Sequence, residues 1–112
     1  MRLFRRRPRP YEELIDHQLA RFAEENDRLM IELADERARY RRARSDTAEE
    51  RFGDVQDVAE EGRDALERLR ESYAVTLVEE IADDYRVEFD RRAAEQYPQF
   101  ALDLDIWARE DD

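Results

Sequence analysis

The spacing of apolar residues in the first half of the chain constrains its fold most strongly. No glycine or proline interrupts residues 11–44, and the apolar side chains recur at steps of three, four or seven: Ile15, Leu19, Phe22, Leu29, Leu33, Tyr40 and Ala43. This repeat is typical of an amphipathic helix that packs along another helix, as in a coiled coil. We expect one helix over about residues 10–44, with Pro10 in its first turn, where the missing N–H costs nothing.

A second helical segment is predicted over residues 54–96. Its apolar positions are Val55, Val58, Leu66, Leu69, Tyr73, Leu77, Ile81, Tyr85 and Phe89. Residues 47–50 have the pattern of a capping box, and Gly53 followed by Asp54 has the pattern of a helix stop and a new N-cap, so we place a hinge at residues 45–54. Pro98 disfavours helix at Tyr97. These features predict an all-α fold: an elongated helical hairpin, or antiparallel coiled coil, over residues 10–97.

One stretch also fits a β-hairpin. Residues 85–90 alternate between apolar and polar, and residues 73–78 are rich in β-branched side chains, with a turn at residues 82–84 between them. We favour helix, because this turn lacks Gly, Asn and Pro and the four-residue spacing continues across it.

The composition agrees with elongated helices. Charged residues make up 46% of the 112 residues and hydrophobic residues 41%, which leaves little material for a thick globular core. Cysteine is absent, so disulfides and Cys-ligated metals are excluded. No apolar run approaches the ~20 residues that span a bilayer. We expect no membrane contact and a cytoplasmic or particle-associated (virion) location.

Charge is unevenly distributed, although the net charge is −11. Residues 1–44 hold 12 Arg and 9 acids (12 − 9 = +3), whereas residues 45–112 hold 8 Arg and 22 acids (8 − 22 = −14). The basic arm, residues 1–9, contains the candidate phosphate contacts Arg2, Arg5, Arg6, Arg7 and Arg9. A second basic cluster comprises Arg37, Arg39, Arg41, Arg42 and Arg44. In a hairpin, that cluster would face the acids Glu49, Glu50, Asp54, Asp57, Glu60 and Glu61, and the arm would approach the acids of residues 103–112.

Few residues are suited to catalysis. The chain has no Cys or Lys, its only aliphatic hydroxyls are Ser45, Thr47, Ser72 and Thr76, and His17 is its only histidine. Glu13 and His17 would share one helix face, but a metal site needs more ligands than this pair. We therefore predict no enzymatic activity, no catalytic residue, no metal, no cofactor and no small-molecule substrate.

Self-association is expected, because a two-helix hairpin cannot bury both apolar stripes by itself. The predicted oligomer interface comprises Leu19, Asn26, Leu29, Leu33, Tyr73, Leu77, Ile81, Tyr85 and Phe89. Asn26 falls in the seam of the first helix, where a buried Asn can specify a parallel two-stranded register. Alternatively, Asn26 lies at the edge of that seam.

Residues 98–112 form an acidic and aromatic tail, which we predict to dock on a protein partner. Its candidate contacts are Phe100, Leu102, Leu104, Ile106 and Trp107, and their spacing fits a short strand, an extended peptide or a last helical turn from Pro98. The leading hypothesis is a helical assembly or adaptor protein, such as a phage or bacterial scaffold component. The alternatives are a nucleic-acid-binding protein that uses the arginine arm, and an acidic decoy that covers a basic protein surface.

Overall fold

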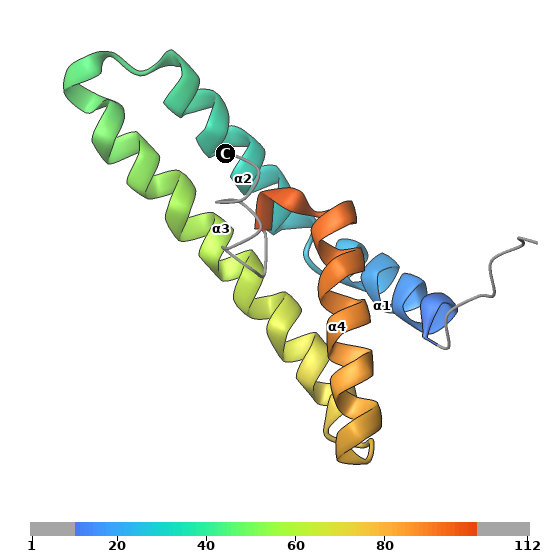
Figure 1. The fold of residues 1–112 in the computed structure, drawn as a ribbon. Coiled ribbons are helices and arrows are strands. Elements are labelled where there is room, and N and C mark those ends of the chain that lie inside the picture. Colours follow the sequence, from blue (N-terminus) through green and yellow to red (C-terminus); the bar gives the residue numbers. More distant parts are fainter. Residues whose placement is uncertain (1–10, 101–112) are drawn as a thin grey trace, which may run out of the picture.

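The computed structural model describes residues 11–100, which form an elongated helical protein with extents of 55 × 33 × 23 Å (Figure 1). Its elements are α1 (Glu12–Glu25), α2 (Asp27–Arg42), α3 (Ser45–Ala74), α4 (Glu79–Gln96) and the 3-10 turn η1 (Pro98–Phe100). Within residues 11–100 there is no strand. The predicted all-α helical hairpin is therefore confirmed, and the β-hairpin alternative is wrong.

Helices α2 and α3 form the hairpin and lie side by side in opposite directions (Figure 1). Only Ala43 and Arg44 connect them, both with extended backbone (ψ of 146° and 162°). The predicted hinge at residues 45–54 is wrong, because this stretch forms the first turns of α3 and Gly53 lies within the helix. A glycine inside a helix costs about 1 kcal/mol relative to Ala. That cost is too small to end a helix whose apolar face continues on both sides of it.

The predicted helix over residues 10–44 is divided at Asn26. The side-chain amide of Asn26 donates a hydrogen bond to the carbonyl of Phe22 (3.0 Å). The backbone carbonyl of Asn26 accepts hydrogen bonds from the backbone N–H groups of Leu29 (3.0 Å) and Met30 (3.2 Å). Asn26 thus ends α1 and begins α2, and its side chain makes this bond within its own chain.

Replacing Asn26 by Ala should lower the free energy of unfolding by about 1 kcal/mol, because the carbonyl of Phe22 loses this partner. Thermal unfolding should then occur roughly 4–8 °C lower. Glu24→Ala, at an exposed position of α1, is the matched control and should melt like the wild type. A higher melting temperature for Asn26→Leu, with loss of a single oligomeric state, would instead place Asn26 in a seam between chains.

The second predicted helix is also divided, at residues 75–78. The hydroxyl of Thr76 donates to the carbonyl of Tyr73 (2.7 Å), and Val78 has extended backbone with ψ of 155°. Val75, Thr76 and Val78 are β-branched and so favour helix weakly, and the hydroxyl of Thr76 competes for a helical carbonyl. The end of α4 at Gln96, before Tyr97 and Pro98, agrees with the prediction.

The main core lies where α1, α4 and the second half of α3 meet (Figure 1). The buried side chains of this region are Ile15, Leu19, Phe22, Leu66, Ala74, Ala82, Tyr85, Phe89, Ala93 and Phe100. Ion pairs fix α4 at its edges: Arg92 reaches Asp16 of α1 (2.7 Å), and Arg70 of α3 reaches Asp90 (2.8 Å). At the opposite end, α2 and α3 are the only described elements that pack together.

Turn η1 sits on α3 through a single glycine. Gly62 is buried, and a Cβ atom added to it would lie 2.2 Å from Cδ1 of Phe100. The ring of Phe100 also contacts Phe22 edge-to-face, with centroids 6.0 Å apart. The absence of a side chain at Gly62 therefore creates the site that holds η1 against the hairpin.

Candidate functional site

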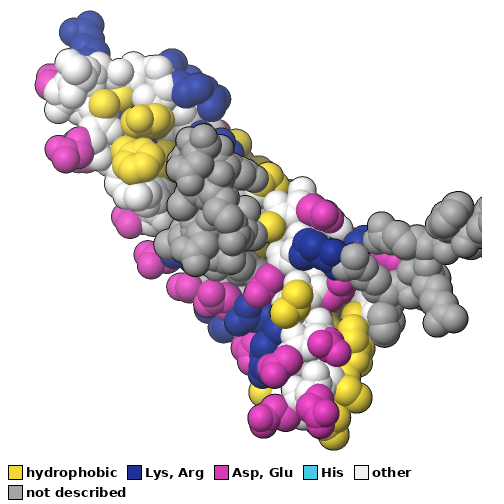
Figure 2. All heavy atoms as spheres, in the orientation of Figure 1, with side chains coloured by type: hydrophobic (Ala, Val, Ile, Leu, Met, Phe, Trp, Pro, Cys, Tyr) yellow, Lys and Arg dark blue, Asp and Glu magenta, His cyan; other side chains and the backbone are white. Residues whose placement is uncertain are grey.

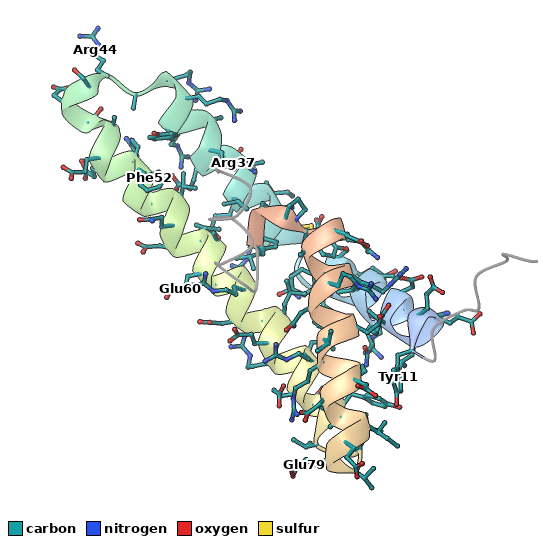
Figure 3. The ribbon with its side chains drawn as sticks, in the orientation of Figure 1. Tyr11, Arg37, Arg44, Phe52, Glu60 and Glu79 are labelled. Atoms are coloured by element: carbon teal, nitrogen blue, oxygen red, sulfur yellow. The ribbon has the colours of Figure 1, made fainter. Side chains whose placement is uncertain are left out.

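An open groove lies between α2 and α3 in the outer half of the hairpin. Its volume is about 390 Å³, and its lining residues are Leu33, Arg37, Tyr40, Arg41, Phe52, Val55 and Gln99. Figure 3 shows Arg37 on α2 and Phe52 on α3, the two helices that bound the groove. We call these seven residues the hairpin groove.

Two aromatic rings form the outer part of the hairpin groove. The centroids of Tyr40 and Phe52 are 5.5 Å apart with an interplanar angle of 50°. The two residues remain 41% and 45% exposed, respectively, unlike the aromatic residues of the main core. Below them, Leu33 is buried and Val55 is half-buried. The groove therefore offers an apolar floor and two exposed rings on one short stretch of surface.

The apolar spacing of α3 explains why Phe52 faces α2. Small or apolar residues recur in α3 at steps of four and three: Ala48, Phe52, Val55, Ala59, Gly62, Leu66, Leu69 and Tyr73. Residues at such spacing share one helix face. The stripe continues to the outer end of α3, where no third helix from residues 11–100 covers the hairpin, and Phe52 is 45% exposed there.

Arginines flank the apolar surface. Figure 2 shows basic side chains next to hydrophobic ones at the outer end of the hairpin. In the second basic cluster, Arg39 pairs with Glu36 (2.8 Å). Among residues 11–100, no ion pair joins Arg37, Arg41, Arg42 or Arg44 to an acid. The guanidinium groups of Arg37 and Arg41 thus flank the groove without a carboxylate partner from the described residues.

The expected pairing of this cluster with acids across the hairpin does not occur within residues 11–100. Of the six acids expected to face the cluster, Asp54 and Glu60 form ion pairs within the described residues. Each pairs with an arginine three positions away on α3: Arg51 with Asp54 (3.5 Å) and Arg63 with Glu60 (3.6 Å). Because the apolar face of α3 packs against α2, the acids of α3 lie on its other faces, toward solvent. This explains the difference.

The structure uses most of the predicted oligomer interface inside one chain. Leu19, Tyr85 and Phe89 are fully buried, and Leu29 and Leu33 are 7% and 3% exposed. A second chain cannot reach these side chains while the fold is intact, which removes them from the interface prediction. The reason is that the chain changes direction at Asn26 and at residues 75–78, so the apolar faces of its helices pack against one another within the same chain. Tyr73 and Leu77 are half-buried, and Ile81 is 42% exposed.

Of the predicted partner-docking residues in the tail, Phe100 alone lies within the described part of the chain. Phe100 is 2% exposed and packs on Gly62, so its side chain belongs to the core and does not dock on a partner in this fold. The other tail contacts, Leu102, Leu104, Ile106 and Trp107, lie outside the described residues, as do the arginines of the arm.

The few side chains whose chemistry could serve catalysis are dispersed along the helices. His17 and Glu13 are exposed on α1, and the hydroxyl of Ser72 donates to the carbonyl of Leu69 (2.7 Å). Within residues 11–100, no group of three or more His, Cys, Asp or Glu side chains is arranged to hold a metal ion.

Packing and ion pairing shift the pKa values of several side chains. The hydrogen bond from Arg86 lowers the pKa of Glu71, and burial raises the pKa of Tyr85 to about 12, although its hydroxyl donates to Oε1 of Gln18 (2.8 Å). Both shifts move the pKa of the group further from neutral pH. An acid or base poised for catalysis near pH 7 would be shifted toward it.

The described part of the chain is thus an all-α helical hairpin with a third packed layer at one end and an open apolar groove at the other. None of its helices, within residues 11–100, is both long and apolar enough to cross a membrane. Comparison of the chain with protein-family models, with curated proteins and with solved structures gives no match.

Proposed function

We propose that this protein is a non-enzymatic helical adaptor or assembly protein that binds an acidic and apolar protein segment in the hairpin groove. One observation carries the proposal. Tyr40 and Phe52 are exposed side by side over an apolar floor, in a groove that is also lined by two arginines that pair with no described acid.

Each part of the groove favours a protein ligand. Aromatic residues and arginine are enriched at protein interfaces and dominate the binding energy where they occur. Partly exposed rings gain free energy when a ligand removes their apolar surface from water, at about 25 cal/mol per Å². The guanidinium groups of Arg37 and Arg41 can each bind a carboxylate through two hydrogen bonds. A ligand with alternating apolar and acidic side chains satisfies both requirements.

A smaller apolar patch supports the expectation of self-association. It lies at the turn between α3 and α4 and comprises Val75 (72% exposed), Val78 (65%) and Ile81 (42%). In an assembly protein, such a patch would supply a contact separate from the groove. We keep the expectation of a cytoplasmic or particle-associated protein as part of this proposal.

The groove is tested by comparing two charge insertions. Phe52→Glu places a carboxylate in the groove, where it removes a ring and repels an acidic ligand. Val87→Glu is the matched control, because Val87 is 68% exposed on α4 and does not line the groove. Circular dichroism should show the same helix content in both variants and the wild type.

The expected result is that proteins purified from the native source with the wild type also bind the Val87→Glu variant but not the Phe52→Glu variant. Titration of such a partner, once purified, should show at least about tenfold weaker binding to Phe52→Glu, equivalent to about 1.4 kcal/mol. Equal binding of every partner to both variants would contradict the proposal. Binding to duplex DNA alone, steeply weakened by salt, would favour the nucleic-acid alternative instead.

A further inference from the structure

The described residues end beside the hairpin groove. Gln99 is one of the lining residues, and Phe100 is anchored on Gly62 of α3. The last described residues therefore lie beside the groove. We propose that residues 101–112, here called the distal tail, occupy the hairpin groove of their own chain until a partner displaces them. This inference rests on the proposed function, because it assigns an occupant to the same groove.

The chemistry of the distal tail complements the groove. Leu102, Leu104 and Ile106 alternate with Asp103 and Asp105, and Trp107 follows. In an extended segment, alternate side chains point to opposite sides. One side then presents Leu102, Leu104 and Ile106 to the floor and rings of the groove. Asp103, Asp105 and Trp107 lie on the other side, toward the rim and its arginines.

Charge favours the same arrangement. The distal tail holds one Arg and five acids (1 − 5 = −4). Arg37 and Arg41 line the groove, and neither pairs with an acid within residues 11–100. The tail therefore supplies the carboxylates that these guanidinium groups lack, and the contact should weaken as salt is added.

The tail is also long enough. The groove residues of α2 extend from Leu33 to Arg41, about 12 Å at 1.5 Å per helical residue. Residues 102–107 span about 20 Å when extended. Because the tail is covalently attached beside the groove, its effective concentration is in the millimolar range, and even weak contacts keep it bound. A foreign ligand must then compete with the tail, so the tail sets the threshold for partner binding.

Trp107 is the only tryptophan of the chain and reports on this contact in the full-length protein. In the docked tail the indole lies at the rim, where it can pack on the guanidinium groups of Arg37 or Arg41. It should then emit at shorter wavelength than free tryptophan and be partly protected from acrylamide quenching. In Phe52→Glu, and in the milder variant Arg41→Glu, the emission should shift to longer wavelength and the protection should be lost. Val87→Glu is the control and should behave like the wild type. The wild-type spectrum should not change on dilution, because the contact lies within one chain.

Three results would overturn the inference. In the first, Trp107 of the wild type is already as exposed as free tryptophan. In the second, Trp107 is protected to the same degree in the groove variants. In the third, protection is lost on dilution together with a halving of mass, which would assign the groove to the tail of a second copy. In the first two cases a partner could still bind the wild type and fail to bind Phe52→Glu. That result would support the proposed function even though the tail inference had failed.

Discussion

Replacing Phe89 by Ala should lower the free energy of unfolding by about 3–5 kcal/mol, the usual cost of truncating a buried aromatic residue. Phe89 is fully buried and its ring lies 5.9 Å from that of Tyr85. Val87→Ala, two residues earlier on α4 and 68% exposed in the wild type, should change the free energy by no more than about 0.5 kcal/mol. Urea unfolding followed by circular dichroism measures both.

The protein concentration decides how this result is interpreted. The effect of Phe89→Ala should be the same at low and high protein concentration, because its ring packs inside one chain. If Phe89 belonged to an interface between copies, the variant would keep its fold and lose mass in solution. Dissociation without loss of stability would therefore contradict the packing described here.

Gly62→Ala should destabilise the protein by roughly 2 kcal/mol, since overpacking a filled core costs about 1–3 kcal/mol. The new Cβ would lie 2.2 Å from Cδ1 and 2.3 Å from Cε1 of Phe100, so the ring must leave its site. The displaced ring also loses part of its burial, which would cost about 1.5–3 kcal/mol if the loss were complete. After the gain of about 1 kcal/mol in helix propensity from Gly to Ala is subtracted, a net loss of roughly 2 kcal/mol remains.

Gly53→Ala is the matched control on the same helix. An added Cβ at Gly53 meets nothing within 4 Å, so only the propensity gain remains. This variant should be more stable than the wild type by about 0.5–1 kcal/mol. Opposite signs for the two Gly→Ala changes, measured by thermal unfolding, are the expected result. If both variants gained stability, the contact between η1 and α3 would be wrong.

The helical character of the chain could be predicted because it depends on local spacing. The steps of three and four are visible in the sequence, and the end of α4 before Tyr97 and Pro98 follows from the geometry of proline. The breaks could not be placed in this way. At Asn26 and Thr76, polar side chains form hydrogen bonds with helical carbonyls. Such bonds compete with helix continuation, and tertiary contacts decide the outcome.

The sequence also could not show whether each apolar helix face packs within one chain or against a second chain. Tyr85 and Phe89 fit a contact between chains as well as a contact within one, until the turn at residues 75–78 returns α4 onto α3. Phe52 was overlooked because it fell in the predicted hinge. Its membership of the stripe that includes Val55 and Ala59 was the signal that could have found it. The arginines Arg37 and Arg41 were noted as a cluster, but their position beside the rings needed the structure.

Site-specific photocrosslinking tests the central claim most directly. A photoreactive phenylalanine at position 52, in the full-length protein within its native source, should form a covalent bond with a protein segment bound in the hairpin groove. The same residue at position 87, exposed on α4, is the control. We predict a discrete crosslinked product from position 52 that is absent from position 87, with the attached peptide rich in acidic and apolar residues. No crosslinked peptide at position 52, or the same products from both positions, would contradict the account.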